Sequence, residues 1–111
     1  MSSIEKLFHE WRNSVDEAAK AKANVVYLTE FRKSKKAILM REAELKGMKT
    51  GQERESYAYS HPEYIELLEG LKVAVETNES LRNRMMIAKE RIGVYRTHEA
   101  NKRKEFGSYG N

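Results

Sequence analysis

The sequence predicts an all-α protein, an antiparallel two-helix coiled-coil hairpin with helices at about 3–46 and 61–103. Charged residues make up 34% of the 111-residue chain, with one Pro and six Gly, a composition typical of long helices. Apolar residues recur at alternating intervals of three and four. The length indicates one domain, predicted at 1–104 with a loop at about 47–60, followed by a frayed tail at 105–111.

The first helix is predicted from a run of residues without Pro or Gly. Ser3 is a suitable N-cap, and Gly47 follows Lys46 as a C-terminal stop. About 44 residues at a rise of 1.5 Å span roughly 65 Å. A helix of this length cannot wrap a small globular core, which favours a coiled coil or bundle.

The second helix is predicted to begin within the segment YSHPEY. Ser60 as N-cap and Glu63 three residues later match a capping box. Pro62 falls in the first turn, where its missing N–H is harmless. Tyr59, before the N-cap, is expected to pack against Tyr64 as a hydrophobic staple.

Both helices carry a predicted heptad seam with a local phase shift. An antiparallel arrangement with one constant register sets Trp11 opposite Tyr95 and Ile38 opposite Leu68. Asn78, a polar seam residue, is expected to specify register at a cost in stability. The predicted seam comprises Trp11, Val15, Val25, Leu28, Phe31, Ile38, Leu68, Leu71, Val75, Asn78, Leu81, Met85, Ile92 and Tyr95.

The charges form blocks that agree with a hairpin. Residues 25–47 hold six cations and three acids, and residues 62–81 hold one cation and five acids. An antiparallel hairpin sets these blocks side by side. Residues 82–104 hold eight cations and two acids, beside a neutral 1–24. The end that carries both termini is therefore predicted to be basic.

Two helices leave apolar residues outside the seam, which predicts self-association. These residues include Tyr27, Leu39, Met40, Ile65, Val73, Met86 and Ile87. Small domains with little core often need a partner. We expect a homo-oligomer, with a dimer favoured, in which two hairpins form a four-helix bundle. Binding to a larger protein partner is the competing explanation.

The sequence predicts no enzyme, no cofactor and no small-molecule substrate. There is no cysteine, so thiolate metal sites are excluded. His9 and His98 are expected near each other, but a metal needs a third and fourth ligand. The segment GMKTGQE does not match a phosphate-binding loop. No nucleophile, base and acid occur in a supporting arrangement, and a hairpin offers no concave pocket.

Nucleic-acid binding by the basic end is the alternative function. Arginine suits phosphate contacts. Only Tyr95 and Phe106 are interleaved with the cations, which disfavours a base-stacking platform. The candidate nucleic-acid-binding residues are Arg82, Arg84, Lys89, Arg91, Arg96, Lys102, Arg103 and Lys104.

Neither a membrane span nor a signal peptide is predicted. No apolar run approaches the ~20 residues of a span. The first residues, MSSIEKLFHEW, carry acids and lack an apolar core. We expect a cytoplasmic protein.

The segments YSHPEY, LR, RI, YRT and ANKR within residues 57–104 resemble small all-helical accessory proteins of tailed bacteriophages. Those proteins tend to be encoded among replication and recombination genes. The resemblance implies an accessory protein that acts in the host cytoplasm, with no catalytic residues to carry over. The leading hypothesis is a non-enzymatic protein that self-associates and binds a host or defence protein.

Overall fold

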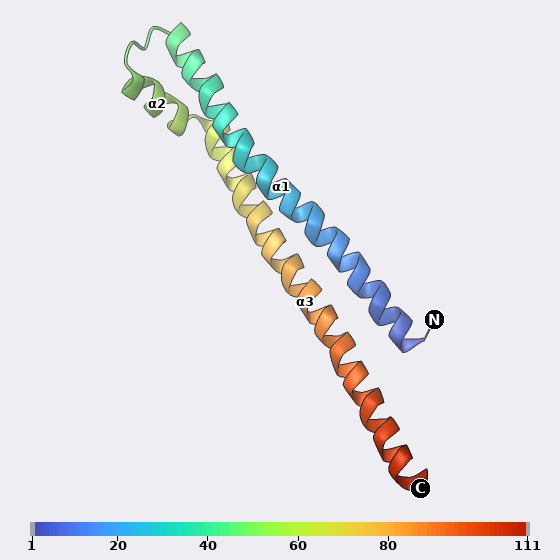
Figure 1. Ribbon diagram of the computed structural model, residues 1–111. Coiled ribbons are helices and arrows are strands. Elements are labelled where there is room, and N and C mark those ends of the chain that lie inside the picture. The colour runs from blue at the N-terminus through green and yellow to red at the C-terminus, as the bar shows by residue number, and fades with distance from the viewer. Residues whose placement is uncertain (1, 111) are drawn as a thin grey trace. The chain divides into compact units, whose positions relative to one another are not determined.

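The computed structural model describes residues 2–110 and is all-α over that range. Its helices are α1 (Ser3–Leu45), α2 (Gly51–Ser60) and α3 (Pro62–Gly110) (Figure 1). The prediction of long helices is confirmed. Residues 105–110, for which a frayed tail is predicted, continue α3; residue 111 lies outside the described residues.

The predicted loop at 47–60 contains a helix of its own. Gly47, at φ +97°, ends α1 in the left-handed conformation that favours glycine. Thr50 then caps α2, because its hydroxyl accepts a hydrogen bond from the Glu53 N–H at 3.1 Å. The signal that was missed is this cap, a threonine with a glutamate three residues later.

The predicted capping box at Ser60 is wrong. The Ser60 hydroxyl donates to the Ser56 carbonyl at 2.7 Å, so Ser60 belongs to the end of α2. His61 breaks the helix with an extended backbone, as expected for a residue that precedes proline. Its Nδ1 accepts a hydrogen bond from the Glu63 N–H at 3.1 Å, so His61 caps α3. The expected contact of Tyr59 with Tyr64 is present, edge to face at 5.3 Å.

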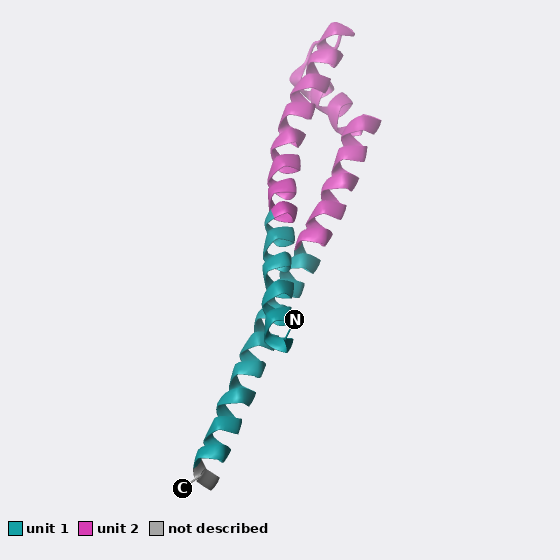
Figure 2. Ribbon diagram, turned by 90° about the vertical axis from the view of Figure 1, so that its right-hand side faces the viewer, with its two compact units in different colours: residues 1–19, 79–111 teal, residues 20–78 magenta. Residues whose placement is uncertain are grey.

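The chain divides into two compact units (Figure 2). Unit 1 comprises residues 1–19 and 79–111, and therefore joins the start of α1 to most of α3. Unit 2 comprises residues 20–78, with the rest of α1, all of α2 and the start of α3.

The buried and half-buried positions of both helices follow an uninterrupted heptad, so the predicted phase shifts are absent. In α1 they include Ile4, Leu7, Trp11, Ser14, Ala18, Ala21, Val25, Leu28, Arg32, Lys35 and Leu39. In α3 they include Tyr64, Leu67, Leu71, Ala74, Asn78, Leu81, Met85, Ala88, Ile92 and Tyr95. A constant spacing of three and four keeps one side of each helix on the seam.

Five predicted seam residues are exposed: Val15, Phe31, Ile38, Leu68 and Val75. At each of these points an adjacent residue is less exposed instead. Ser14, Leu39 and Ala74 are buried, and Arg32 and Leu67 are half-buried. The prediction followed the largest apolar side chain, whereas the heptad accepts small residues and the aliphatic stem of an arginine. The nine other predicted seam residues are buried or half-buried.

The register in unit 1 also differs from the prediction. The predicted register places Arg96 beside Glu10. Instead, the Arg91 guanidinium donates to the Glu10 carboxylate at 3.1 Å, and Arg96 lies 5.7 Å from the centre of the Phe8 ring. The two helical segments are displaced along each other by about one turn, or ~5 Å, from the predicted register.

The same direction of shift occurs in unit 2. The predicted register places Leu39 opposite Leu67. Instead, Leu39 forms a buried cluster with Tyr64 and with Ala58 of α2. The short helix α2, which the sequence analysis missed, therefore supplies part of this core.

We expect two glycine substitutions to have opposite effects on stability. Gly70 lies inside α3 with nothing within 4 Å of an added Cβ, so Gly70→Ala stabilises the protein by about 0.5–1 kcal/mol. Gly47→Ala destabilises it, because alanine is strained at φ +97°. Urea denaturation followed by circular dichroism measures both. A loss of stability in Gly70→Ala would contradict the helical position of Gly70.

Candidate interaction surfaces

The described residues gather no ready-made metal site. No group of three or more His, Cys, Asp or Glu side chains lies close enough to hold an ion within the described range. The His9 ring nitrogen instead lies 3.2 Å from the Asn13 amide. None of the described helices has an apolar stretch long enough to cross a membrane.

Two tyrosines of α2 contact Lys36 of α1 and Lys46, which directly follows α1. The Lys46 ammonium donates to the Tyr57 hydroxyl at 2.9 Å, which raises the pKa of Lys46. The Lys36 ammonium lies 4.8 Å from the centre of the Tyr59 ring and 3.3 Å from the Glu55 carboxylate, and both contacts raise the pKa of Lys36. These cation contacts hold α2 against α1, which explains the concentration of tyrosine in this segment.

An ion pair between Lys35 and Glu63 connects α1 to the first turn of α3. The ammonium nitrogen and carboxylate oxygen are 2.7 Å apart, and the contact lowers the pKa of Glu63. It joins the basic block 25–47 to the acidic block 62–81, as the charge pattern predicted.

Unit 2 carries an exposed apolar row on α1, which we call the α1 row. It consists of Tyr27, Phe31, Ile38 and Leu45, which lie within about 40° of each other around the helix. Tyr27 and Phe31 stack with ring centres 5.9 Å apart. Ile38 and Leu45 are 57% and 76% exposed. These residues flank the seam and contact mainly solvent.

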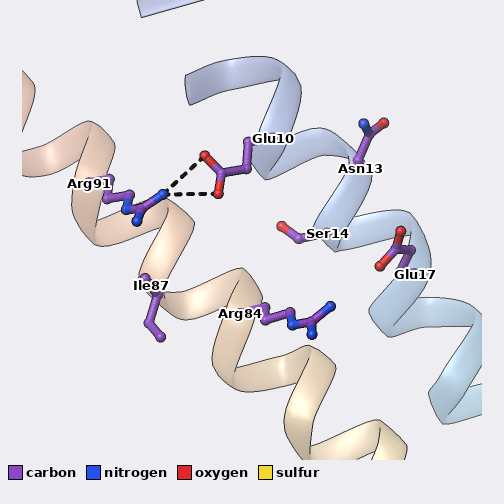
Figure 3. A pocket seen from close by; sticks show the side chains of 7 residues that line it. All are labelled: Glu10, Asn13, Ser14, Glu17, Arg84, Ile87 and Arg91. Carbon is purple, nitrogen blue, oxygen red and sulfur yellow. Dashed lines mark hydrogen bonds and ion pairs between the residues drawn. The ribbon is translucent and has the colours of Figure 1, made fainter. Parts of the chain in front are cut away.

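Unit 1 has a groove whose polar end lies between α1 and α3 (Figure 3). The Arg91 guanidinium donates to both carboxylate oxygens of Glu10, at 3.1 and 3.4 Å. Glu17 and Arg84 line the same hollow. Ser14 between them is buried and donates its hydroxyl to the Trp11 carbonyl at 2.7 Å.

The apolar end of the unit 1 groove is lined by Leu7, Ile87, Val94 and Tyr95. Ile87 and Arg91 line both hollows, so the two hollows lie next to each other. Ile87 and Val94 are 53% and 69% exposed. His98, one of the two histidines considered as a metal ligand, lies at this end.

The candidate nucleic-acid-binding cations do not form one cluster. Arg82, Lys89, Arg96 and Arg103 lie seven residues apart along one line of α3, which we call the basic row. Arg84 and Arg91 line the groove instead. The last two candidates are Lys102, which pairs with Glu99 on its own helix at 3.6 Å, and the exposed Lys104.

Sequence reasoning missed the acidic side of the groove, although the chain holds a signal for it. Glu10 and Glu17 are seven residues apart, and so are Arg84 and Arg91. Positions that flank an antiparallel heptad seam meet across it, and opposite charges there pair the two helices. A heptad assigned without a phase shift places these two pairs of opposite charge on facing flanks of the seam.

No protein family, no curated protein and no solved structure matches this chain. The resemblance to bacteriophage proteins therefore stays a prediction.

We expect Lys35→Met to raise the pKa of Glu63. The folded-state pKa of Glu63 lies below the unfolded value of about 4.3. The pair therefore stabilises the fold above that pH, and this contribution is lost as the pH falls through the folded-state pKa. Titration of the Glu63 carboxyl carbon by NMR measures the change. Lys33→Met is the matched control, because Lys33 pairs with Glu30 on its own helix. An unchanged Glu63 pKa in Lys35→Met would contradict the ion pair.

Proposed function

We propose that this protein acts without catalysis, by binding other proteins and by self-association. The observation that carries the proposal is the distribution of large apolar side chains. Eight apolar residues of the described part of the chain are buried. Five of these are alanine, and the three large ones are Leu39, Tyr64 and Ile92. Among the described residues fifteen large apolar side chains are exposed. Such an excess outside the core is typical of a surface that docks on a partner.

We further propose that the helices form an antiparallel hairpin and that two copies form a four-helix bundle. Contacts within each unit support this arrangement. In unit 1 Glu10 near the start of α1 meets Arg91 far along α3, and in unit 2 Lys35 late in α1 meets Glu63 early in α3. A bundle of two hairpins would cover apolar rows that flank the seam.

The groove chemistry favours binding over catalysis. Glu10 and Arg91 are exposed and neutralise each other. Catalytic carboxylates are usually placed in enclosed pockets where burial shifts their pKa. A bacterial host or defence protein is the target class that the bacteriophage resemblance implies.

We expect light scattering to give about 26 kDa at micromolar concentration, twice the chain mass of 12.9 kDa. Ile38→Glu on the α1 row should weaken the association by at least about tenfold, because a buried unpaired carboxylate is costly. Ala37→Glu is the matched control, since Ala37 is exposed one position away and lies off the row. A mass of 12.9 kDa at every concentration would overturn self-association.

Nucleic-acid binding is the second candidate, favoured by the basic row. Arg82, Lys89, Arg96 and Arg103 repeat every seven residues, or about 10.5 Å, on one side of α3. Such a row can contact successive phosphates of a backbone.

We expect a fluorescent DNA duplex to bind at about 50 mM salt and to dissociate steeply as salt rises, because phosphate contacts release counterions. Reversing two charges of the basic row, with Lys89→Glu and Arg103→Glu, should abolish binding. The control reverses Lys33 and Lys72, which are exposed elsewhere. No binding by the unaltered protein at low salt excludes this candidate.

A further inference from the structure

Unit 2 has a groove with one apolar side and one acidic side. A single hollow is lined by Phe31 and Lys35 of α1 and by Glu66 and Gly70 of α3, among others. Phe31 belongs to the α1 row, so this apolar row and the acidic start of α3 border the same hollow. We call this hollow with its two sides the unit 2 groove.

The acidic side of the unit 2 groove carries carboxylates without a cation partner. Glu66 and Glu69 are exposed and lie about 60° apart around α3. Within residues 2–107 neither of them forms an ion pair. Lys35, which also lines the groove, is neutralised by Glu63 at 2.7 Å. The groove therefore favours an occupant that offers a cation next to an apolar side chain.

Unit 1 carries this combination on a side of α3 that does not line the unit 1 groove. Arg82, Met86 and Lys89 lie within about 60° of each other around the helix. Met86 is 54% exposed. Lys89 is exposed and forms no ion pair within residues 2–107. These three residues are hereafter called the unit 1 edge.

We propose that a second copy of this chain docks its unit 1 edge in the unit 2 groove. Lys89 of one copy then lies between Glu66 and Glu69 of the other, and Met86 packs on the Phe31 ring. A methionine sulfur makes favourable contacts with an aromatic ring. The inference rests on the self-association proposed above and assigns it to two surfaces.

The signs of the charges select this pairing of surfaces. Two acidic grooves repel each other, and so do two basic edges, whereas a groove and an edge attract. A contact between two different surfaces leaves one groove and one edge free on each dimer. Association beyond the dimer is therefore expected as the protein concentration rises above the micromolar range.

The order of side chains around α3 sets the direction of the docked helix. Met86 lies about 60° to one side of Lys89, and reversing the helix exchanges the two sides. Met86 faces the α1 row while Lys89 faces α3 only if the docked segment runs antiparallel to the start of α3. In that direction Met86 lies about 4.5 Å further along the groove than Lys89. It thereby reaches the level of Gly70, which lines the hollow together with Phe31.

The first test alters each surface separately and measures association by sedimentation equilibrium. The groove variant carries Glu66→Lys and Glu69→Lys, and the edge variant carries Arg82→Glu and Lys89→Glu. Each variant on its own sets like charges against each other at the contact. We therefore expect each to raise the dissociation constant by at least about tenfold.

The second test mixes the groove variant and the edge variant in equal amounts. The mixture holds an intact edge on the groove variant and an intact groove on the edge variant. It should therefore regain the association that each variant alone has lost. Circular dichroism of each variant shows whether it remains helical, and recovery in the mixture also requires that both fold.

Two control variants have the same changes in net charge outside both surfaces. Asp16→Lys with Glu105→Lys matches the groove variant, and Lys33→Glu with Lys72→Glu matches the edge variant; all four residues are exposed. Both controls should leave the dissociation constant within about twofold, since surface substitutions usually change little.

The outcomes separate this inference from the proposed function. A monomeric unaltered protein overturns both. Association that resists either variant, or that helical variants do not regain when mixed, overturns the inference and leaves self-association standing. An edge variant that loses DNA binding but keeps self-association assigns the edge to nucleic acid and also overturns the inference. Weakening by each variant alone, with recovery in the mixture, supports it.

Discussion

Within each unit, a heptad seam between a segment of α1 and a segment of α3 is the constraint on which the rest of the structure depends. Each helix can present only one narrow side to the other, and a spacing of three and four residues keeps that side constant. The seam here includes Ser14, Ala18, Ala74 and Ala88, all of them buried. Small side chains allow close approach of the backbones but bury little apolar area, so the seam contributes only modestly to stability.

Because small side chains occupy much of the seam, many of the larger apolar side chains lie outside it. Phe31, Ile38, Ile87 and Val94 occupy positions that flank the seam or face away from it. Solvent-exposed rows of this kind lose the hydrophobic free energy that burial would provide. We propose that association with a partner covers these rows. The charges beside the rows, such as Glu10 with Arg91, then contribute orientation more than affinity.

Local contacts decide how the chain turns between α1 and α3. Gly47 ends α1, Thr50 starts α2, and His61 separates α2 from α3 by one extended residue. Lys46 on Tyr57 adds a cation contact that holds the turn together. Each of these exposed contacts contributes little to the free energy of unfolding, but together they fix one geometry of the turn. Ala58 of α2 is completely buried, which makes the turn part of the unit 2 core.

The sequence by itself determined the helical class, both ends of the first long helix, the start of the second and the complementary charge blocks. These depend on composition and on residues close together in the chain. Only the tertiary structure decided the seam and the register. The side chains of Val15 and Ser14 point about 100° apart around the helix, and so do those of Ile38 and Leu39. Placing either residue of such a pair on the seam gives an amphipathic helix. The larger side chain suggests one choice, but contact with the opposite helix selects the other. The α1 row and the groove follow from that selection, because they consist of the side chains that the seam leaves outside.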